Sequence, residues 1–219
     1  MQVKSNPERS EATRQALIWA ARALFIEKGY AATSTPEIVA VAGVTRGALY
    51  HHYADKQALF RAVAEHESRA LAAEIEVAAH PGLGPVAALV AGSAAYLTAM
   101  TVPGRTRLLL VDAPAVLGAA AATALDEAGA AATLRAGLAA ALGDRSGGLP
   151  LAELATLLSA AFDRAALEID QGGDAAAYRS AMVGLIDCVL GLPAARARRT
   201  GGEPSATGGA DDAGAGPAR

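Results

Sequence analysis

The feature that most constrains this chain is a pair of short helix signals in the segment TPEIVAVAGVTRGALYHHYADK, residues 35–56. Thr35 is a favourable N-cap, Pro36 suits the first turn of a helix, and Glu37 places a negative charge at the positive end of the helix dipole. Gly43 can adopt the left-handed conformation that ends helices. The segment therefore predicts a helix that begins at Thr35 and stops at a tight turn.

A second helix is predicted directly after this turn. Thr45 is its expected N-cap, and the helix runs from Arg46 to about Tyr53, so that Leu49 and Tyr53 lie one turn apart and face the core. The opposite side then presents an arginine, a glycine, a tyrosine and a histidine at positions 46, 47, 50 and 51. Arginine can bind a guanine edge through two hydrogen bonds, and tyrosine and histidine can contact bases or phosphates. Two short helices arranged in this way indicate a DNA-reading module.

The residues around this module carry a resemblance to a known family. Together, ALFIEKGY and AGVTRGALYHHYADKQALF closely resemble the DNA-binding domain of the TetR family of bacterial transcriptional repressors, over about Thr13 to Val63. The resemblance implies that Thr35 contacts the sugar-phosphate backbone and that the helix from Arg46 lies in the major groove. Lys56 directly follows Asp55, the expected N-cap of a third helix, and would bind a phosphate. The candidate DNA-binding residues are Thr35, Thr45, Arg46, Gly47, Tyr50, His51, His52 and Lys56.

Charge and composition agree with a cytoplasmic DNA-binding protein. The net charge is −3, but residues 1–60 carry +2 and the remainder −5, so positive charge is in excess beside the predicted DNA-reading helix. The single cysteine, Cys188, excludes a disulfide within the chain, and its apolar surroundings predict that it is buried. No signal peptide is visible, and the run from Val86 to Val102 is too short and too rich in small residues to span a membrane.

The periodicity of apolar residues predicts an all-α chain with two folded domains. We expect a flexible N-terminus at 1–10, a three-helix helix-turn-helix domain at 11–56, a helical ligand-binding and dimerisation domain at 57–192, and a disordered tail at 193–219 that has no Leu, Ile, Val or aromatic residue. In the second domain, Pro114 should separate a brief helix from an alanine-rich helix that reaches about Leu142. The last two helices are expected at 151–169 and 175–192.

These last two helices carry apolar stripes. In the TetR family such a pair packs against its twin as a four-helix bundle, so the resemblance implies a homodimer. The alternative is that the stripes only close the core of one chain. The candidate interface residues are Leu154, Leu158, Phe162, Tyr178, Met182, Leu185, Ile186 and Val189.

The segment RLLLVDAPAVLG, residues 107–118, resembles part of the effector domains of TetR-like proteins. It implies a mostly apolar ligand pocket, for which the candidate lining residues are Tyr96, Met100, Leu110, Phe162 and Asp163. Asp163 interrupts an apolar run, and it either faces the cavity as a polar anchor or forms a salt bridge within the dimer.

The sequence contains no motif typical of an enzyme, a metal site or a cofactor site. We therefore expect a ligand-responsive repressor that binds an inverted-repeat operator as a dimer and is released by a small, mostly apolar effector. A ligand-independent DNA-binding or architectural protein is the alternative.

Overall fold

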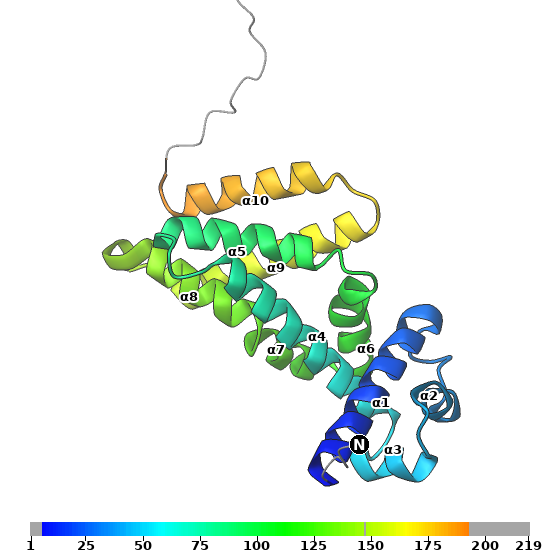
Figure 1. The fold of residues 1–219 in the computed structure, drawn as a ribbon. Helices are drawn as coiled ribbons and strands as arrows, with labels where there is room; N and C mark the ends of the chain where they lie inside the picture. The colour runs from blue at the N-terminus through cyan, green and yellow to red at the C-terminus, as the bar shows by residue number, and fades with distance from the viewer. Residues whose placement is uncertain (1–5, 147, 193–219) are drawn as a thin grey trace, which may run out of the picture.

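The structure is a computed structural model that describes residues 6–146 and 148–192, and in these ranges every regular element is a helix (Figure 1). None of the described helices is long and apolar enough to cross a membrane. The tail predicted to be disordered, residues 193–219, lies outside the described residues, as do residues 1–5 of the predicted flexible N-terminus.

The first three helices form the predicted helix-turn-helix unit. They are α1 (Asn6–Lys28), α2 (Thr35–Ala42) and α3 (Arg46–His52), and α4 (Lys56–Ala78) follows them. Their common core contains Leu17, Phe25, Ile38, Leu49 and Phe60, each of which is fully buried. The rings of Phe25 and Phe60 lie 5.3 Å apart between centroids, so α1 packs directly on α4.

The start of α1 differs from the prediction of a loose segment up to residue 10. The helix begins at Asn6, and Glu8 places a negative charge in its first turn. Pro7 also lies in this first turn, where a helix does not need the amide hydrogen that proline lacks. These local signals explain the earlier start.

The N-cap of α2 is Ser34, not Thr35 as predicted. The Ser34 hydroxyl accepts a hydrogen bond from the Glu37 amide at 3.4 Å, and a Glu37 carboxylate oxygen accepts one from the Ser34 amide at 2.9 Å. This reciprocal capping box favours Ser34 over its neighbour and leaves Thr35 as the first helical residue. Gly43 ends α2 in the left-handed conformation, with φ of 67°. Thr45 caps α3 as predicted, through a bond of 3.1 Å from the Ala48 amide.

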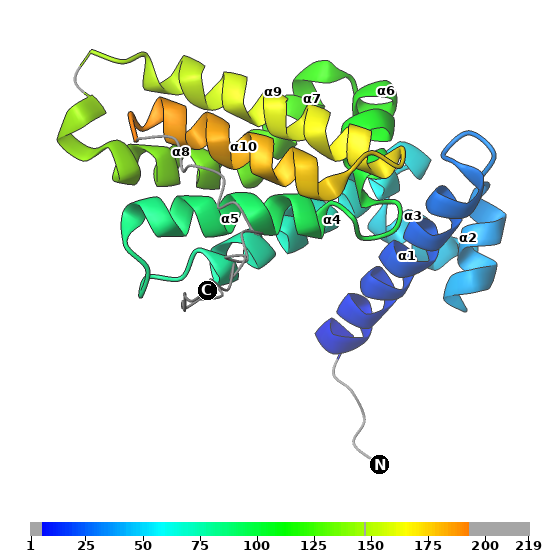
Figure 2. The same cartoon turned by 90° about the horizontal axis from the view of Figure 1, so that it is seen from above.

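The remaining helices form the larger part of the molecule (Figure 1). They are α5 (Pro85–Ala99), the π-helical η1 (Arg107–Asp112), α6 (Ala113–Leu117), α7 (Ala119–Glu127), α8 (Ala130–Leu142), the 3-10 helix η2 (Gly143–Ser146), α9 (Leu151–Asp170) and α10 (Ala175–Val189). Figure 2 shows α9 and α10 side by side, with α5 next to α10.

Pro114 does not separate two helices, contrary to the prediction. It lies in the first turn of α6, which continues η1. The chain breaks instead at Gly118, where φ is 87°, and again at Gly129. A Cβ atom at Gly129 would lie 2.5 Å from the Ser68 hydroxyl oxygen, so glycine permits the close approach of α8 to α4. Pro114 therefore fits within the first turn of a helix, whereas the breaks between helices fall at the two glycines.

Helix α4 contributes to both hydrophobic cores of the described chain. Leu59, Phe60 and Val63 belong to the core of the helix-turn-helix unit, whereas Leu71 and Ile75 belong to the core formed by α5, α8, α9 and α10. The two parts of the molecule therefore share one continuous helix.

Candidate nucleic-acid interface and ligand cavity

The exposed face of α3 carries the predicted base-reading side chains. Arg46, Gly47, Tyr50 and His51 are exposed, and Leu49 on the opposite side is fully buried. The guanidinium carbon of Arg46 lies 5.6 Å from the centroid of the Tyr50 ring, in a cation–π arrangement. The face therefore combines a cation, a hydroxyl and an imidazole on one short helix.

Tyr50 connects this face to α2. Its side chain hydrogen-bonds with Thr35 and with Arg46, and these contacts lower the pKa of the Tyr50 hydroxyl below its ordinary value. Thr35, the candidate backbone-contacting residue, thus lies next to two candidate base readers.

The two histidines at the end of α3 differ in their surroundings. His51 is exposed on the same face as Tyr50, whereas His52 is half-buried, and its ring centroid lies 6.4 Å from that of Tyr53. The two imidazole centroids are 5.2 Å apart. Of the pair, His51 has the geometry suited to contact with DNA, and a contact from His52 stays a prediction.

Lys56 has a role in the fold that the sequence did not reveal. Its ammonium donates hydrogen bonds to the carbonyl oxygens of Tyr30 at 2.8 Å and Thr33 at 2.9 Å, and it lies 4.3 Å from the centroid of the Tyr30 ring. Two of its three N–H donors are therefore used to tie the α1–α2 loop to the start of α4. The phosphate contact expected of Lys56 stays a prediction, and it has at most one donor free of the fold.

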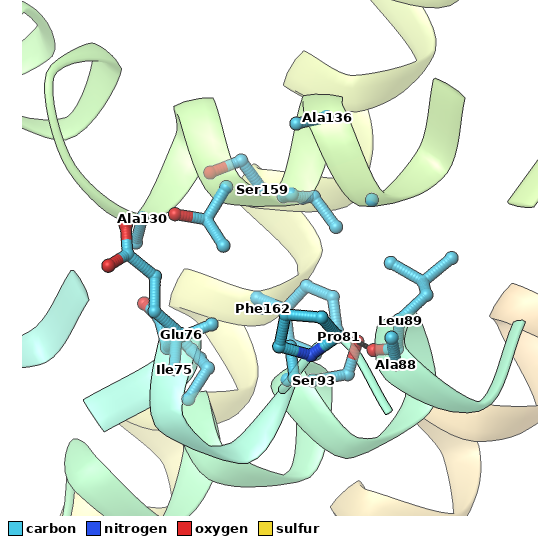
Figure 3. A pocket seen from close by; sticks show the side chains of 16 residues that line it. Ile75, Glu76, Pro81, Ala88, Leu89, Ser93, Ala130, Ala136, Ser159 and Phe162 are labelled. Carbon is cyan, nitrogen blue, oxygen red and sulfur yellow. Dashed lines mark hydrogen bonds between the residues drawn. The ribbon is translucent and has the colours of Figure 1, made fainter. Parts of the chain in front are cut away.

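A cavity of about 450 Å³ lies between α4, α5, α8 and α9 (Figure 3). Tyr96 and Phe162, two of the five predicted lining residues, are in its wall. Most of the wall is apolar, and its polar groups come from Glu76, Ser93, Tyr96, Thr133 and Ser159. A volume of this size matches that of small-molecule sites in proteins.

The other three predicted lining residues lie elsewhere. Met100 lines only a space of about 40 Å³ next to Tyr96, too small for an organic ligand. Leu110 and Asp163 line that space and also a second cavity of about 370 Å³, between η1, α7, α8 and α9. The sequence did not reveal which small residues line the main cavity, such as Gly92 and Gly137, because alanine and glycine are frequent throughout this part of the chain.

Two hydroxyl–carboxylate pairs lie between the two large cavities. The Tyr96 hydroxyl donates to Asp163 Oδ1 at 2.6 Å, and the Ser159 hydroxyl donates to Asp126 Oδ2 at 3.2 Å. Burial raises the pKa of Asp163 to about 6, and the nearby Asp126 adds to this rise while the bond from Tyr96 opposes it. Burial also raises the pKa of Asp126. Asp163 thus lines the second cavity and not the main one, and its role as a polar anchor for a ligand stays a prediction.

An ion-pair network joins the helix-turn-helix unit to the larger part of the molecule. Glu67 of α4, which is 3% exposed, accepts hydrogen bonds from Arg22 of α1 at 2.6 Å and from Arg105 at 2.9 Å. Arg105 also donates to Glu74 at 3.0 Å. Burial opposes ionisation of Glu67, but the two guanidinium groups hold its pKa below the ordinary value.

The contact between α1 and α4 continues on the surface beside this network. The ring of Trp19 on α1, which is 53% exposed, meets the ring of His66 on α4 edge to face, with centroids 5.2 Å apart. This pair is one residue from Glu67 along α4 and one helical turn from Arg22 along α1. The aromatic contact therefore lies at the joint that the ion pairs hold.

Four of the predicted dimer-interface residues are buried within the single chain. Leu158, Phe162, Met182 and Ile186 belong to its own core, so at these positions the structure agrees with the alternative that the stripes close the core of one chain. Leu154, Tyr178 and Val189 are half-buried, and Leu185 is exposed. The outer face of α9 and α10 also carries two residues that the prediction missed or misplaced: Leu157 is 70% exposed, and Cys188 is exposed rather than buried.

Comparison with known proteins covers both parts of the chain. A model of the family described as bacterial regulatory proteins, tetR family, matches residues 17–63, and one described as tetracyclin repressor-like, C-terminal domain, matches residues 86–192. The HTH-type transcriptional repressor AcnR of Corynebacterium diphtheriae is 39% identical over 83 residues, which are 38% of this chain and 42% of that protein. The chain spans between 24% and 42% of the length of the first curated relatives that it matches.

Solved structures extend the likeness to nearly the full length. A TetR-family transcriptional regulator from Pectobacterium atrosepticum is 30% identical, with a TM-score of 0.62 over 86% of this chain and 97% of that one. RolR, solved in complex with the ligand resorcinol, shares the fold at 20% identity, with a TM-score of 0.58 over 87% of this chain and 93% of RolR. The matched family models and the Pectobacterium regulator together show that this chain belongs to the TetR family of bacterial transcriptional regulators.

Proposed function

We propose that the chain is a ligand-responsive repressor that binds an inverted-repeat operator as a homodimer and is released by a small molecule. The observation that carries this proposal is the exposed face of α3, where Arg46 lies over the Tyr50 ring and His51 lies beside them. In this proposal residues 11–56 read DNA, and residues 57–192 bind the effector and the partner chain. The relative AcnR, a named repressor, supports the assignment.

The base-reading set consists of Arg46, Tyr50 and His51, with Thr35, Thr45 and Gly47 against the phosphate backbone. Arg46 has the reach and geometry for two hydrogen bonds to a guanine edge. Lys56 has a smaller role in DNA contact in this proposal, because two of its three donors bind carbonyl oxygens of the fold, and His52 is half-buried at the end of α3.

The effector site is the cavity of about 450 Å³, together with the neighbouring cavity of about 370 Å³. Ile75 and Glu76 of α4 line the first cavity, and eight residues earlier on α4 Glu67 holds Arg22 of the helix-turn-helix unit. A ligand that displaces α4 would therefore move α3 relative to its half-site. A coupling of about 1–3 kcal/mol would lower operator affinity roughly 5- to 150-fold. The ligand complex of RolR supports a small-molecule site in this fold.

The dimer interface in this proposal is the outer face of α9 and α10. Leu157, Leu185 and Cys188 are exposed there, and Leu154, Tyr178 and Val189 flank them. Large apolar side chains exposed on adjacent helices favour a contact with a second copy across a two-fold axis. Leu185→Glu should give monomers in sedimentation velocity, whereas Glu153→Gln, near the exposed start of α9, should leave the dimer intact.

The test of DNA binding is a footprint of the full chain on the DNA that flanks its own gene. We expect a protected inverted repeat, and Arg46→Ala and Tyr50→Ala should each weaken binding by about 1–3 kcal/mol. Arg69→Ala removes an exposed arginine from α4 and serves as the matched control. Equal protection by all variants would disprove the assignment of α3. Binding that is seen only at low salt and without sequence preference would favour the ligand-independent alternative.

A further inference from the structure

Two carboxylates from different helices share the wall of the second cavity. Asp126 of α7 and Asp163 of α9 both line this cavity of about 370 Å³ and the narrow space beside it. Each accepts a hydrogen bond from a hydroxyl group, of Ser159 and of Tyr96, that also lines the main cavity. The two acids thus stand at the boundary between the cavities, where a ligand in either cavity would come close to them.

Neither carboxylate has a positive partner within the described chain. Among the side chains described, those of residues 7–144 and 148–192, no lysine or arginine forms an ion pair with Asp126 or Asp163. Arg135 lines the same cavity but is exposed and contacts neither acid as an ion pair. By contrast, the buried Glu67 is held by two guanidinium groups. An ionised carboxylate taken out of water is costly unless a cation or several donors satisfy it.

We propose that the effector is an organic cation whose charged group lies between Asp126 and Asp163. This proposal rests on the effector site proposed above. The apolar portion of the effector would contact the leucines and alanines of the second cavity, among them Leu109, Leu110 and Ala155. The effector would supply the positive charge that the described side chains do not place there.

Other ligand classes fit this wall less well. An anion would be repelled by two carboxylates, and a neutral apolar molecule would remove the remaining water from both without replacing its hydrogen bonds. A metal ion lacks ligands, because the described residues contain no group of three or more His, Cys, Asp or Glu side chains that could hold one. Burial raises the pKa of both acids, and a bound cation would offset this effect.

The experiment compares a permanent cation with an uncharged molecule of the same shape. Benzyltrimethylammonium and neopentylbenzene differ by one nitrogen and one positive charge, and both are small enough for the cavity. Their binding to the full chain is measured by calorimetry and by the shift of the unfolding temperature, without DNA. Asp126→Asn and Asp163→Asn keep the shape of each side chain and remove its charge. Asp170→Asn, at the exposed end of α9, is the matched control.

We expect the cation to bind at least about 30-fold more tightly than the neutral molecule. This preference should fall by a similar factor in Asp163→Asn and in Asp126→Asn. It should not change in Asp170→Asn. Equal binding of the two molecules, an unchanged preference in both cavity variants, or no binding of the cation at millimolar concentration would each overturn the proposal. The footprint assay is independent of this result, so a protein that protects its operator yet shows no preference for cations would retain the proposed function and lose only the effector class.

Discussion

Replacing Asp163 by asparagine should make the ligand-free protein more stable. The pKa of Asp163 rises from 3.8 to about 6, first because the carboxyl is buried and then because Asp126 lies nearby. Since one pKa unit corresponds to about 1.4 kcal/mol, the ionised side chain lowers the free energy of unfolding by about 3 kcal/mol. Asparagine keeps an oxygen that accepts the Tyr96 hydroxyl and carries no charge. Asp163→Asn should therefore recover much of this free energy.

The gain in the free energy of unfolding expected for Asp163→Asn depends on pH. The folded state holds the Asp163 proton more tightly than the unfolded state does, so the stabilisation is fully present below about pH 4 and is lost as the pH rises through about 6. Asp163→Asn should match the native chain at low pH and exceed it by a constant amount above pH 6.

Urea unfolding of both proteins across this range, at one fixed protein concentration, measures the difference, with Asp170→Asn as the control. A variant that is less stable than the native chain, or a gain that does not change with pH, would refute the reasoning. The first result would also indicate that Asp163 is kept for the fold.

Three further substitutions test contacts that hold the helix-turn-helix unit. Lys56→Met removes two hydrogen bonds to carbonyl oxygens, so thermal unfolding should show a free energy of unfolding that is lower by roughly 2 kcal/mol. An unchanged melting temperature would contradict a structural role for these bonds. Glu67→Gln leaves the buried Arg105 without its full counter-charge and should cost roughly 3 kcal/mol in urea unfolding, which an equally stable variant would disprove. Gly104→Ala places a Cβ atom 2.5 Å from Ile26 at a φ of 78° and should cost about 1–3 kcal/mol, part of which Ile26→Ala should restore.

The helix-turn-helix unit could be predicted well from the sequence because its signals are local. Caps at Thr45 and Asp55 and the glycine at 43 each act within one turn, and all three have the predicted roles. The error at the start of α2 is also local: Ser34 and Thr35 are both good caps, and only the reciprocal bond with Glu37 decides between them.

The larger part of the molecule was harder to predict because its helices are rich in alanine. In α10, the stripe that includes Met182 and Ile186 is apolar, and so is the stripe that includes Leu185 and Cys188. Periodicity alone does not show which stripe faces inward, and the structure places the first in the core and the second on the surface. Cavities are similarly invisible to periodicity, because they depend on which small residues of four helices meet.

The edge-to-face contact of Trp19 and His66 has a practical consequence. Trp19 is the only tryptophan in the chain, and it lies at the joint between α1 and α4. The tryptophan emission of the protein therefore arises from one side chain, whose indole contacts the His66 imidazole. A change in the separation of these rings alters the signal without any added label. The fluorescence of Trp19 in the unmodified protein thus reports how the helix-turn-helix unit packs against the rest of the molecule.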